Sequence, residues 1–597
     1  MEIKFEQNKD LTSLNTFHIK AKAKLFATYS RVEELHKISF SPEFMENEVF
    51  YLGGGSNVLF NGDFDGLVLK SEIKGIKRYD KDSETVFLIA GAAELWTDVV
   101  DFAIKEGLAG IENLAAIPGT AGAAPVQNIG AYGSEIGEVI HKVECFDVIS
   151  HNTLTLTAEQ CRFGYRDSIF KNEGKGRYVV LRVSLKLKNS NLAENLSYGP
   201  LKKLKEKLGR TPTISEVAKE VTEIRNSKLP DHAKIGNAGS FFKNPVVRIY
   251  FYKEVMSTLC PDIPYYETED PYYVKIPAGW LIEHAGLKGF SIGGAEVYSQ
   301  QCLVIANKGE ASSRDVIEVA SHVVKTVLSK FGVVLRPEVN IIDSEIKVTI
   351  LGSGTSKGIP EIGCHCPVCT STDSKDKRTR CSALVETRGV RLLIDVSPDF
   401  RMQALNNEIS YLDAALITHN HYDHVGGFDD LRPFCANGKF PIYLRPDVNA
   451  DLHRRLDYCF SDTHYPGVPS FEMNEIENAP FMIKGVRITP VTVMHGKVPI
   501  VGFRIGNFAY ITDAKTIEEE EKEKLEGLDM LVVNGLRDKD HFAHFTIAEA
   551  LELIEELKPK RAYLTHFCHE VGKHCDLERR LPENVFPCYD GMTIITK

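Results

Sequence analysis

This sequence of 597 residues has no long apolar segment. No window approaches about 18 uninterrupted apolar residues, the length at which a helix begins to span a bilayer. Its beginning, MEIKFEQNKDLTSLNTF, also lacks the basic stretch and apolar run of a secretory signal. These absences argue against a membrane-spanning helix, and we expect a cytoplasmic protein with no membrane partner.

An excess of basic residues is lacking too. Against 71 Lys and Arg residues stand 82 Asp and Glu residues, so the formal net charge at pH 7 is -11. Because nucleic-acid surfaces need clustered cations, we expect small-molecule substrates rather than nucleic acid. The sequence also contains no fixed-period repeat and no low-complexity segment, which argues against solenoid and array architectures.

The sequence does contain enough apolar material for several ordinary cores. Hydrophobic residues make up 43% and charged residues 26%, both near globular averages. A chain of 597 residues exceeds the length at which a single core stops growing. Strand-like apolar runs alternate with helical patterns around 32–38, 215–229 and 314–330, so we expect a multidomain fold of mixed α+β and α/β class. We place the units at residues 1–72, 73–210, 211–328, 329–345 and 346–597.

Two glycine-rich segments lie in the first and second of these units. Residues 53–60 read GGGSNVLF, and residues 117–133 read IPGTAGAAPVQNIGAYG. Glycines leave backbone N–H groups unobstructed, which suits an anion such as a pyrophosphate, although a tight turn uses glycine in the same way. Two such segments, the second with the amides of Gln127 and Asn128, indicate one extended, flat ligand.

The order of motifs over the first half is that of a known family. The sequence carries NTF at 15–17, GGGSNVLF, the IPG loop, FGYRDSIFK at 163–171, GNAGSFFKNP at 236–245 and RPEV at 336–339. Together these motifs resemble the UDP-N-acetylenolpyruvoylglucosamine reductases (MurB), flavoenzymes of peptidoglycan synthesis. The resemblance implies that the first two units bind FAD and the third binds substrate. It also implies that the fourth returns to the FAD region with a catalytic glutamate, and that NADPH reduces the flavin.

Three residues are candidates for the chemistry. Reduction of an enolpyruvyl ether leaves negative charge beside the substrate carboxylate, so the site needs a cation and a proton donor. Arg166 suits the first task because a guanidinium holds a carboxylate bidentately; the alternative is an ion pair with Asp167. By the resemblance, Ser240 matches the proton donor and Glu338 the acidic partner of the developing enol. Without the resemblance, Ser240 would be interpreted as a turn serine and Glu338 as an exposed loop acid. The alternative function for this half of the chain is a non-catalytic flavin-binding regulatory module.

The resemblance also implies which residues bind ligands. Contacts to FAD fall to Gly53, Gly54, Gly55, Ser56, Asn57, Val58, Ile117, Pro118, Gly119, Gln127, Asn128, Gly130 and Tyr132. Contacts to the sugar nucleotide fall to Tyr198, Lys228, Asn244 and Gln301, of which Tyr198 marks the subtype with a tyrosine loop. Ala123 and Ala124 depart from the family, in which a hydroxyl often stands beside the flavin phosphates. We expect backbone or water to replace that hydrogen bond.

Residues 413–427, DAALITHNHYDHVGG, combine a buried strand with a loop that carries four metal-ligand side chains. His419 and His421 can reach one metal while Asp423 and His424 turn to a second, about 3.5–4 Å away, as in two-metal hydrolases. Solvated surface histidines are the alternative. Further candidates directly follow strand-like runs: His495, Asp513 and His566.

This order and spacing resemble the metallo-β-lactamase fold, an αββα sandwich that hosts many hydrolases. The resemblance implies that one divalent metal is held by His419, His421 and His495. It implies that the other is held by Asp423, His424 and His566, with Asp513 as the bridge. Because His and carboxylate ligands accept Zn²⁺ and Mn²⁺ alike, the sequence leaves the choice of metal open.

Cysteines crowd into residues 363–385, GCHCPVCTSTDSKDKRTRCSALV. In a chain expected to be cytoplasmic, Cys364, Cys366 and Cys369 indicate a structural zinc rather than disulfides. Its fourth ligand is either His365 or His569. The segment from LGSGTSKGIP to CSALV, together with HFTIAEALELIEELKPKRAYLTH, resembles the PhnP-type phosphodiesterases, and this resemblance favours His569.

The PhnP resemblance implies a phosphodiesterase that acts on a small, cyclic phosphodiester. His544 in AHFT matches the histidine that acts as an acid or contacts the phosphate; a helix-start histidine is the alternative. A tRNase Z-like ribonuclease is disfavoured, because residues 436–479 show no basic, glycine-rich arm for tRNA. A thioester or lactone hydrolase is the other alternative. LGSGTSKG lacks the GxxxxGK[ST] order, so we expect a turn there and no bound nucleotide.

Overall fold

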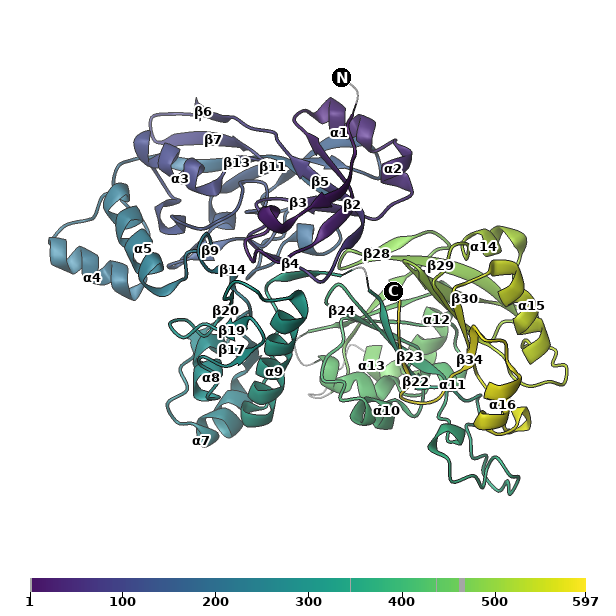
Figure 1. Cartoon of the computed structure of the whole chain (residues 1–597). Helices are drawn as coiled ribbons and strands as arrows, with labels where there is room; N and C mark the ends of the chain where they lie inside the picture. The colour runs from purple at the N-terminus through teal and green to yellow at the C-terminus, as the bar shows by residue number, and fades with distance from the viewer. Residues whose placement is uncertain (1–2, 344, 436–437, 461–467, 597) are drawn as a thin grey trace. The chain divides into compact units, whose positions relative to one another are not determined.

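The computed structural model describes residues 3–343, 345–435, 438–460 and 468–596. The chain divides into two compact units, Met1–Ser344 and Glu345–Lys597 (Figure 1), called the N-terminal and C-terminal units below. Each mixes helices and strands, as expected. Among the described residues, no helix combines the length and the apolar character needed to cross a membrane.

Some sequence predictions fall partly on residues outside the described ranges. Residue 344 belongs to the predicted unit 329–345. Residues 436–437 and 461–467 belong to the segment 436–479, which was predicted to carry no tRNA-binding arm.

The N-terminal unit begins with a sheet in the order β1-β2-β5-β3. Its strands are β1 (Glu6–Asp10), β2 (Lys22–Tyr29), β3 (Val49–Leu52) and β5 (Phe64–Ser71). Helices α1 (Val32–Ile38) and α2 (Pro42–Met45) connect β2 to β3. β5 lies between β2 and β3 and pairs in parallel with both, so β2 and β3 run in the same direction and need the long helical connection that parallel strands of one sheet require.

A parallel strand pair joins the beginning of this unit to its end. β4 (Val58–Phe60) follows the first glycine-rich loop, and β21 (Asn340–Ile342) pairs with it in parallel. The backbone N–H of Asn340 donates to the carbonyl oxygen of Asn57 at 3.1 Å. Glu338, two residues before Asn340, is thereby placed beside the glycine-rich loop.

A second, antiparallel sheet follows in the order β12-β11-β13-β7-β6, and β8 also pairs with β13. Its strands are β6 (Ile76–Asp80), β7 (Thr85–Gly91), β8 (Leu108–Ala109), β11 (Ile140–Asp147), β12 (Asn152–Thr157) and β13 (Tyr178–Asn189). The helices are α3 (Trp96–Lys105), α4 (Gly199–Leu208) and α5 (Ile214–Lys228). Their apolar faces share one core with the sheet, through Trp96, Leu201 and Val217. The second glycine-rich loop leads into the hairpin β9 (Gly130–Ala131) and β10 (Ser134–Glu135).

The remainder of the N-terminal unit packs small sheets against helix α9. The sheets run in the orders β14-β20-β19-β18 and β15-β17-β16. Their strands are β14 (Gly236–Ser240), β15 (Val246–Arg248), β16 (Tyr266–Glu267), β17 (Tyr273–Lys275), β18 (Ser291–Ile292), β19 (Ala295–Val297) and β20 (Val304–Asn307). The helices are α6 (Ile249–Phe251), α7 (Ser257–Leu259), α8 (Ala278–His284) and α9 (Ser313–Phe331). A capping box of Ser312 with Asp315 starts α9, and Gly332 at φ 69° ends it.

The C-terminal unit contains sheets that stack face to face. One runs in the order β27-β26-β25-β24-β23-β22-β35 and the other in the order β28-β29-β30-β31-β32-β33-β34. The first is built from β22 (Lys347–Gly352), β23 (Ser382–Thr387), β24 (Val390–Ile394), β25 (Ala414–Leu416), β26 (Phe440–Leu444), β27 (Phe471–Glu475) and β35 (Thr593–Ile595). The second is built from β28 (Phe481–Ile483), β29 (Val486–His495), β30 (Val498–Ile505), β31 (Phe508–Ile511), β32 (Met530–Asn534), β33 (Arg561–Thr565) and β34 (Val585–Pro587).

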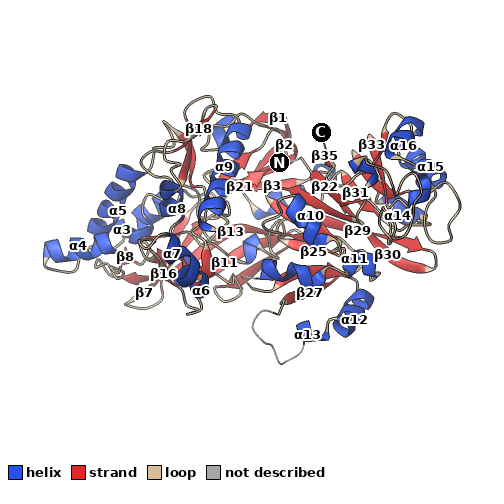
Figure 2. Ribbon diagram, turned by 90° about the horizontal axis from the view of Figure 1, so that it is seen from below, coloured by secondary structure: helices blue, strands red, loops and turns tan. Residues whose placement is uncertain are grey.

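Helices cover the outer faces of these sheets, so the unit is the expected αββα sandwich (Figure 2). The helices are α10 (Phe400–Asn406), α11 (Tyr422–Val425), α12 (Pro446–Arg455), α13 (Asp457–Phe460), α14 (Glu519–Glu523), α15 (Ile547–Leu557) and α16 (His574–Arg580). The central core takes apolar residues such as Val348 from one sheet and Phe503 from the other. α10 and α12 pack on the first sheet, and α15 and α16 pack on the second.

Candidate active sites

A cavity of about 570 Å³ lies in the N-terminal unit, within the size range that holds cofactors. Both glycine-rich loops contribute to its walls, through Ser56 and Asn57 from one and Ile117 and Pro118 from the other. The loops approach each other backbone to backbone, because a Cβ on Gly54 would lie only 2.9 Å from the Cα of Gly119. Glycine at these positions therefore brings two distant segments together.

The guanidinium of Arg166 faces the same cavity. Its Nε lies 3.2 Å from Glu338 Oε1 and its Nη1 lies 3.6 Å from Glu135 Oε1. Nη2 donates to the carbonyl oxygen of Gly130 at 2.6 Å. The alternative ion pair with Asp167 is not what the structure shows, since that carboxylate accepts from Asn172 Nδ2 at 3.1 Å. Arg166 is therefore held at the cavity as a cation with acidic neighbours.

Ser240 reaches the cavity from β14, and Glu338 reaches it from the loop just before β21. Ser240 ends β14, and its neighbour Phe241 accepts the backbone N–H of Glu338 at 2.7 Å. The side chain of Glu338 is only 13% exposed, which differs from an exposed loop acid. The structure thus brings Arg166, Ser240 and Glu338 into one cavity from three parts of the sequence.

Two lysines contact the backbone of Arg166. The Nζ atoms of Lys171 and Lys243 each lie 3.4 Å from its carbonyl oxygen, while the backbone of Arg166 takes the left-handed φ of 54°. Burial lowers the pKa of Lys171 to about 8, and the nearby charge of Lys243 acts in the same direction. Their contacts with the carbonyl oxygen of Arg166 stabilise its left-handed backbone conformation, which is strained for a residue other than glycine.

The other predicted ligand residues divide between the cavity wall and its surroundings. Lining residues are Ser56, Asn57, Ile117, Pro118, Gln127 and Gly130. Outside the lining lie Gly53, Gly54, Gly55, Val58, Gly119, Asn128, Tyr132, Tyr198, Lys228, Asn244 and Gln301. The amide of Asn128 is engaged within the protein, donating to Glu135 at 2.7 Å and accepting from Gly137 at 2.8 Å. The Asn128 amide therefore stabilises the conformation of the loop, whereas the sequence predicts that it faces a ligand.

Sequence reasoning missed Arg225, a half-buried residue of α5 that lines the cavity. Its Nε donates to the carbonyl oxygen of Ala116 at 3.1 Å, at the start of the IPG loop. Burial lowers its pKa, while the neighbouring hydroxyl of Tyr132 acts to raise it. An arginine within an amphipathic helix carries no signal of its own, so only the tertiary structure could reveal this cation.

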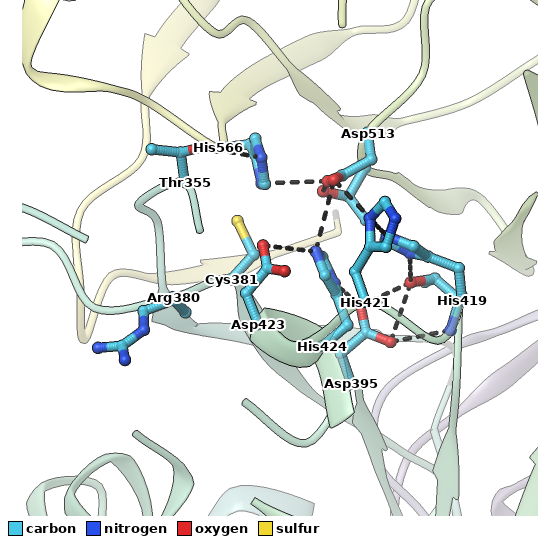
Figure 3. A network of polar contacts seen from close by, with 12 residues as sticks. Thr355, Arg380, Cys381, Asp395, His419, His421, Asp423, His424, Asp513 and His566 are labelled. Atoms are coloured by element: carbon cyan, nitrogen blue, oxygen red, sulfur yellow. Dashed lines mark hydrogen bonds and ion pairs between the residues drawn. The ribbon is translucent and has the colours of Figure 1, made fainter. Parts of the chain in front are cut away.

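In the C-terminal unit, the predicted metal ligands gather in two overlapping clusters (Figure 3). One contains His419, His421, His495 and Asp513, and the other contains Asp423, His424, Asp513 and His566. Within each cluster the ligand atoms lie within 4.8 Å of one another, and Asp513 belongs to both. His495 ends β29, and Asp513 and His566 closely follow β31 and β33. The other four residues follow β25, with Asp423 and His424 in the short helix α11.

Buried nitrogen atoms show that these clusters fit metal ions. His424 Nε2 and His566 Nδ1 are buried and have no hydrogen-bond partner among the described residues. Asp513 Oδ2 lies 3.5 Å from the first, and Asp513 Oδ1 lies 3.1 Å from the second. A buried acceptor without a donor is costly, whereas convergent imidazole and carboxylate groups are the usual ligands of Zn²⁺ and related ions.

Electrostatics around Asp513 favour a bound cation. Burial would raise the pKa of its carboxyl, yet His566 and His424 outweigh burial and hold that pKa well below its usual range. Burial also lowers the pKa of His419 well below its ordinary value. An ionised Asp513 is the form that binds a metal, whereas the carboxylates around His424 outweigh burial and raise its pKa, so a metal ion would have to displace a proton from that imidazole.

Asp395 is a supporting residue that sequence reasoning missed. It follows β24 and accepts His424 Nδ1 at 2.6 Å and the Thr418 hydroxyl at 2.8 Å. This contact orients His424 with Nε2 toward the cluster. Asp395, Asp513 and His566 share positive φ values of 60°, 58° and 60°, a strained conformation that concentrates at functional sites. The sequence feature that could have indicated Asp395 is its position directly after the strand-like run LLI.

The cysteine cluster forms a separate group. His569 Nδ1 lies 3.2, 3.6 and 3.4 Å from the sulfur atoms of Cys364, Cys366 and Cys369. His365, the competing fourth ligand, is exposed and is not part of the group. Three thiols and one imidazole at these distances fit a closed structural zinc site.

A second cavity, of about 450 Å³, opens over the two clusters. It is lined by His421, Asp423, His495, Asp513 and His566, and also by His544. The ring of His544 lies 4.6 Å from that of His495, and its buried Nδ1 has no hydrogen-bond partner among the described residues, although Asp513 Oδ2 lies 4.0 Å away. Burial lowers the pKa of His544 to about 3, with His566 adding to the effect. His544 is therefore a neutral imidazole at the cavity wall.

Thr355 contacts the candidate metal ligand His566. Its Oγ1 lies 3.2 Å from His566 Nε2 (Figure 3). In the tautomer that donates from Nε2 to this oxygen, the lone pair of Nδ1 is left for a metal ion on the side of Asp513. We expect Thr355→Val to weaken metal binding about 10- to 100-fold, as the loss of such supporting contacts does. Competition with a chromogenic chelator measures this. Thr355→Ser keeps the hydroxyl and should retain wild-type affinity; equal affinity in the Val variant would contradict the role.

Comparisons with known proteins follow the same division of the chain. Residues 230–342 match the model of the UDP-N-acetylenolpyruvoylglucosamine reductase C-terminal domain, and residues 25–150 match an FAD binding domain. Residues 390–567 match the beta-lactamase superfamily domain.

Named relatives cover the N-terminal half. The UDP-N-acetylenolpyruvoylglucosamine reductase of Neisseria gonorrhoeae is 48% identical over 336 residues, 55% of this chain and 95% of that protein. The Flavobacterium johnsoniae reductase is 41% identical over 343 residues, 57% of this chain and 100% of that protein. Among solved structures, a diphosphatase of the PhnP family is 37% identical and covers 42% of this chain and 97% of its own, with a TM-score of 0.40.

The folds, the sites and these matches define a two-part enzyme, in which an FAD-binding oxidoreductase precedes a metallo-β-lactamase-fold hydrolase. The chain belongs, through its N-terminal unit, to the UDP-N-acetylenolpyruvoylglucosamine reductase family. Both family resemblances expected from the sequence are therefore confirmed.

Proposed function

We propose that the N-terminal unit reduces UDP-N-acetylglucosamine enolpyruvate to UDP-N-acetylmuramate, with NADPH as reductant. The observation that carries this proposal is the convergence of Arg166, Ser240 and Glu338 on one cavity walled by both glycine-rich loops. FAD fits that cavity because both glycine-rich loops wall it and because Asn57 and Gln127, whose amides are hydrogen-bonded to each other, still offer Asn57 Oδ1 and Gln127 Nε2. When bound there, FAD would supply the hydride received from NADPH.

The residues of the chain supply the rest of the chemistry. Arg166 binds the substrate carboxylate and stabilises the negative charge that develops on the adjacent carbon. The hydroxyl of Ser240 donates a proton to that carbon. Glu338, 3.2 Å from Arg166, fixes the guanidinium at the cavity and stabilises the enol form. Each role uses a group that lines the cavity.

Purified protein tests this function directly. The reductase should oxidise NADPH much faster with the enolpyruvyl substrate than without it, and UDP-N-acetylmuramate should form in equal amount. A yellow protein that shows no substrate-dependent oxidation would instead be a non-catalytic flavin-binding module.

We further propose that the C-terminal unit hydrolyses a small phosphodiester, for which a cyclic ester is the best candidate. Support comes from the sharing of Asp513 between the two ligand clusters beneath one cavity of about 450 Å³. His419, His421 and His495 would hold one divalent metal, and Asp423, His424 and His566 the other. Two bound metals, Zn²⁺ or Mn²⁺, supply positive charge for an in-line displacement at phosphorus. Cys364, Cys366, Cys369 and His569 would hold a structural zinc.

His544 is proposed to hold the leaving oxygen. As a neutral imidazole it can donate one N–H to that oxygen and so stabilise the charge that develops there. We expect His544→Ala to lower hydrolysis of bis-p-nitrophenyl phosphate about 100-fold or more while metal content stays unchanged. The matched control is His453→Ala, an exposed histidine of α12.

A substrate panel separates the alternatives for this unit. With Mn²⁺ or Zn²⁺ added, phosphodiesters should be cleaved and thioesters and lactones should not. Cleavage of thioesters or lactones alone would contradict the phosphodiesterase proposal, and cleavage of precursor tRNA in preference to small esters would favour a ribonuclease.

A further inference from the structure

An exposed aromatic ring lines the cavity of the C-terminal unit. Phe542 is 81% exposed, yet it lines the same cavity as Asp513 and His566. Its neighbour His541 lines the cavity too, with ring centroids 4.8 Å apart and 31° between the ring planes. Neither ring takes part in the proposed metal binding or in the proposed stabilisation of the leaving oxygen.

His541 connects this ring pair to the reacting centre. Its ring lies 4.9 Å from that of His544. The ring of His544 in turn lies 4.6 Å from that of His495 and 4.8 Å from that of His566. A group attached to a phosphate above the two clusters can therefore contact His541 and Phe542.

The loop that carries both rings is firmly anchored. Arg537 donates to the carbonyl oxygens of Lys539 at 3.3 Å and Asp540 at 3.4 Å. Lys515 forms an ion pair with Asp540 at 2.9 Å. On the far side, the carbonyl oxygen of Ala543 lies 3.0 Å from Nδ1 of the ligand His495. The rings are therefore positioned before a ligand binds, which lowers the entropy lost on binding.

The charged groups of the same wall already have partners. Lys357 pairs with Glu361 at 2.8 Å, and Arg537 pairs with Glu570. The wall thus offers flat ring faces and neutralised cations, a surface that favours a planar ring over a second phosphate or an alkyl chain.

We propose that His541 and Phe542 form a subsite that stacks on a planar aromatic ring, such as a nucleobase, carried by one ester group of the phosphodiester. This inference rests on the hydrolase function proposed above and specifies the substrate class of that site. Stacking of one ring on an aromatic side chain changes affinity by roughly 5- to 100-fold.

Binding of two simple phosphates tests the subsite apart from turnover. Phenyl phosphate and methyl phosphate carry the same charged group and differ in the ring. The metal-loaded full-length protein should bind phenyl phosphate about tenfold more tightly in isothermal titration. Phe542→Ala should remove most of this preference and leave methyl phosphate binding unchanged, whereas Phe542→Tyr should keep it. His541→Ala should weaken the preference in the same direction.

The control is Leu405→Ala, an exposed apolar residue of α10 outside the cavity lining, which should behave as wild type. Equal binding of both phosphates by the wild type, or an unchanged preference in both ring variants, overturns the subsite. A wild type that binds neither phosphate overturns the hydrolase proposal and the subsite with it.

Discussion

Asp513→Asn is expected to lower phosphodiester hydrolysis by more than about 100-fold while substrate-dependent NADPH oxidation continues at the wild-type rate. Loss of a contact that merely orients a metal ligand weakens binding or activity about 10- to 100-fold, and loss of a shared ligand should exceed that. Asp513 is the residue common to both clusters, with Oδ2 3.7 Å from His419 Nε2 and 3.5 Å from His424 Nε2. Asparagine keeps the size of the side chain and removes its charge.

Metal analysis should separate the sites in this variant. The two ions of the cavity should be lost or weakly held, whereas the zinc of the cysteine cluster should remain, since its four ligands are untouched. Asp529→Asn is the matched control, because that carboxylate is also buried but pairs with Lys560 at 2.7 Å outside the site. Full metal content and full hydrolysis in Asp513→Asn would show that this carboxylate is not a shared ligand.

Ser240→Ala should keep the yellow colour of bound flavin and lose substrate-dependent NADPH oxidation by about 100- to 10,000-fold. The hydroxyl stands at the end of β14 and lines the cavity, but it shapes neither glycine-rich loop. Removal of one oxygen atom therefore takes away a proton donor without disturbing the cofactor site. The loss should appear in kcat, because a proton transferred in the transition state contributes little to substrate binding.

Ser257→Ala provides the comparison for this variant. Its hydroxyl donates to the carbonyl oxygen of Lys253 at 2.6 Å within a helical segment, away from the cavity lining. It should match the wild type in stopped-flow measurements of flavin reduction by NADPH and of flavin reoxidation by substrate. If Ser240→Ala reoxidises at the wild-type rate, another group donates the proton.

Much of the fold could be predicted from local sequence patterns. The helical pattern at 32–38 coincides with α1, and that at 314–330 differs from α9 by one residue at each end, because caps define such boundaries. The candidate metal-binding loop could be predicted from the sequence because its ligand residues lie close together, at His419, His421, Asp423 and His424. Whether these residues bind metal stays a prediction that the proposed variants test.

Residues that act through tertiary contacts were not predictable in the same way. Arg225 reads as an ordinary helix cation until α5 packs beside the IPG loop. Asp395 supports His424 across 29 positions of sequence, and a single aspartate after a strand is common. Phe542 is informative only because it is exposed inside a cavity, which no sequence pattern records.

The strand pairs at the ends of each unit bear on how the protein is synthesised. β21 pairs with β4 in the N-terminal unit, and β35 pairs with β22 in the C-terminal unit. A growing chain can therefore complete the reductase fold, including the strand next to Glu338, before the last hydrolase strand has been translated. The hydrolase must wait for residues 593–595, so a chain released early would carry a finished reductase and a β22 that is paired with β23 but has an open outer edge.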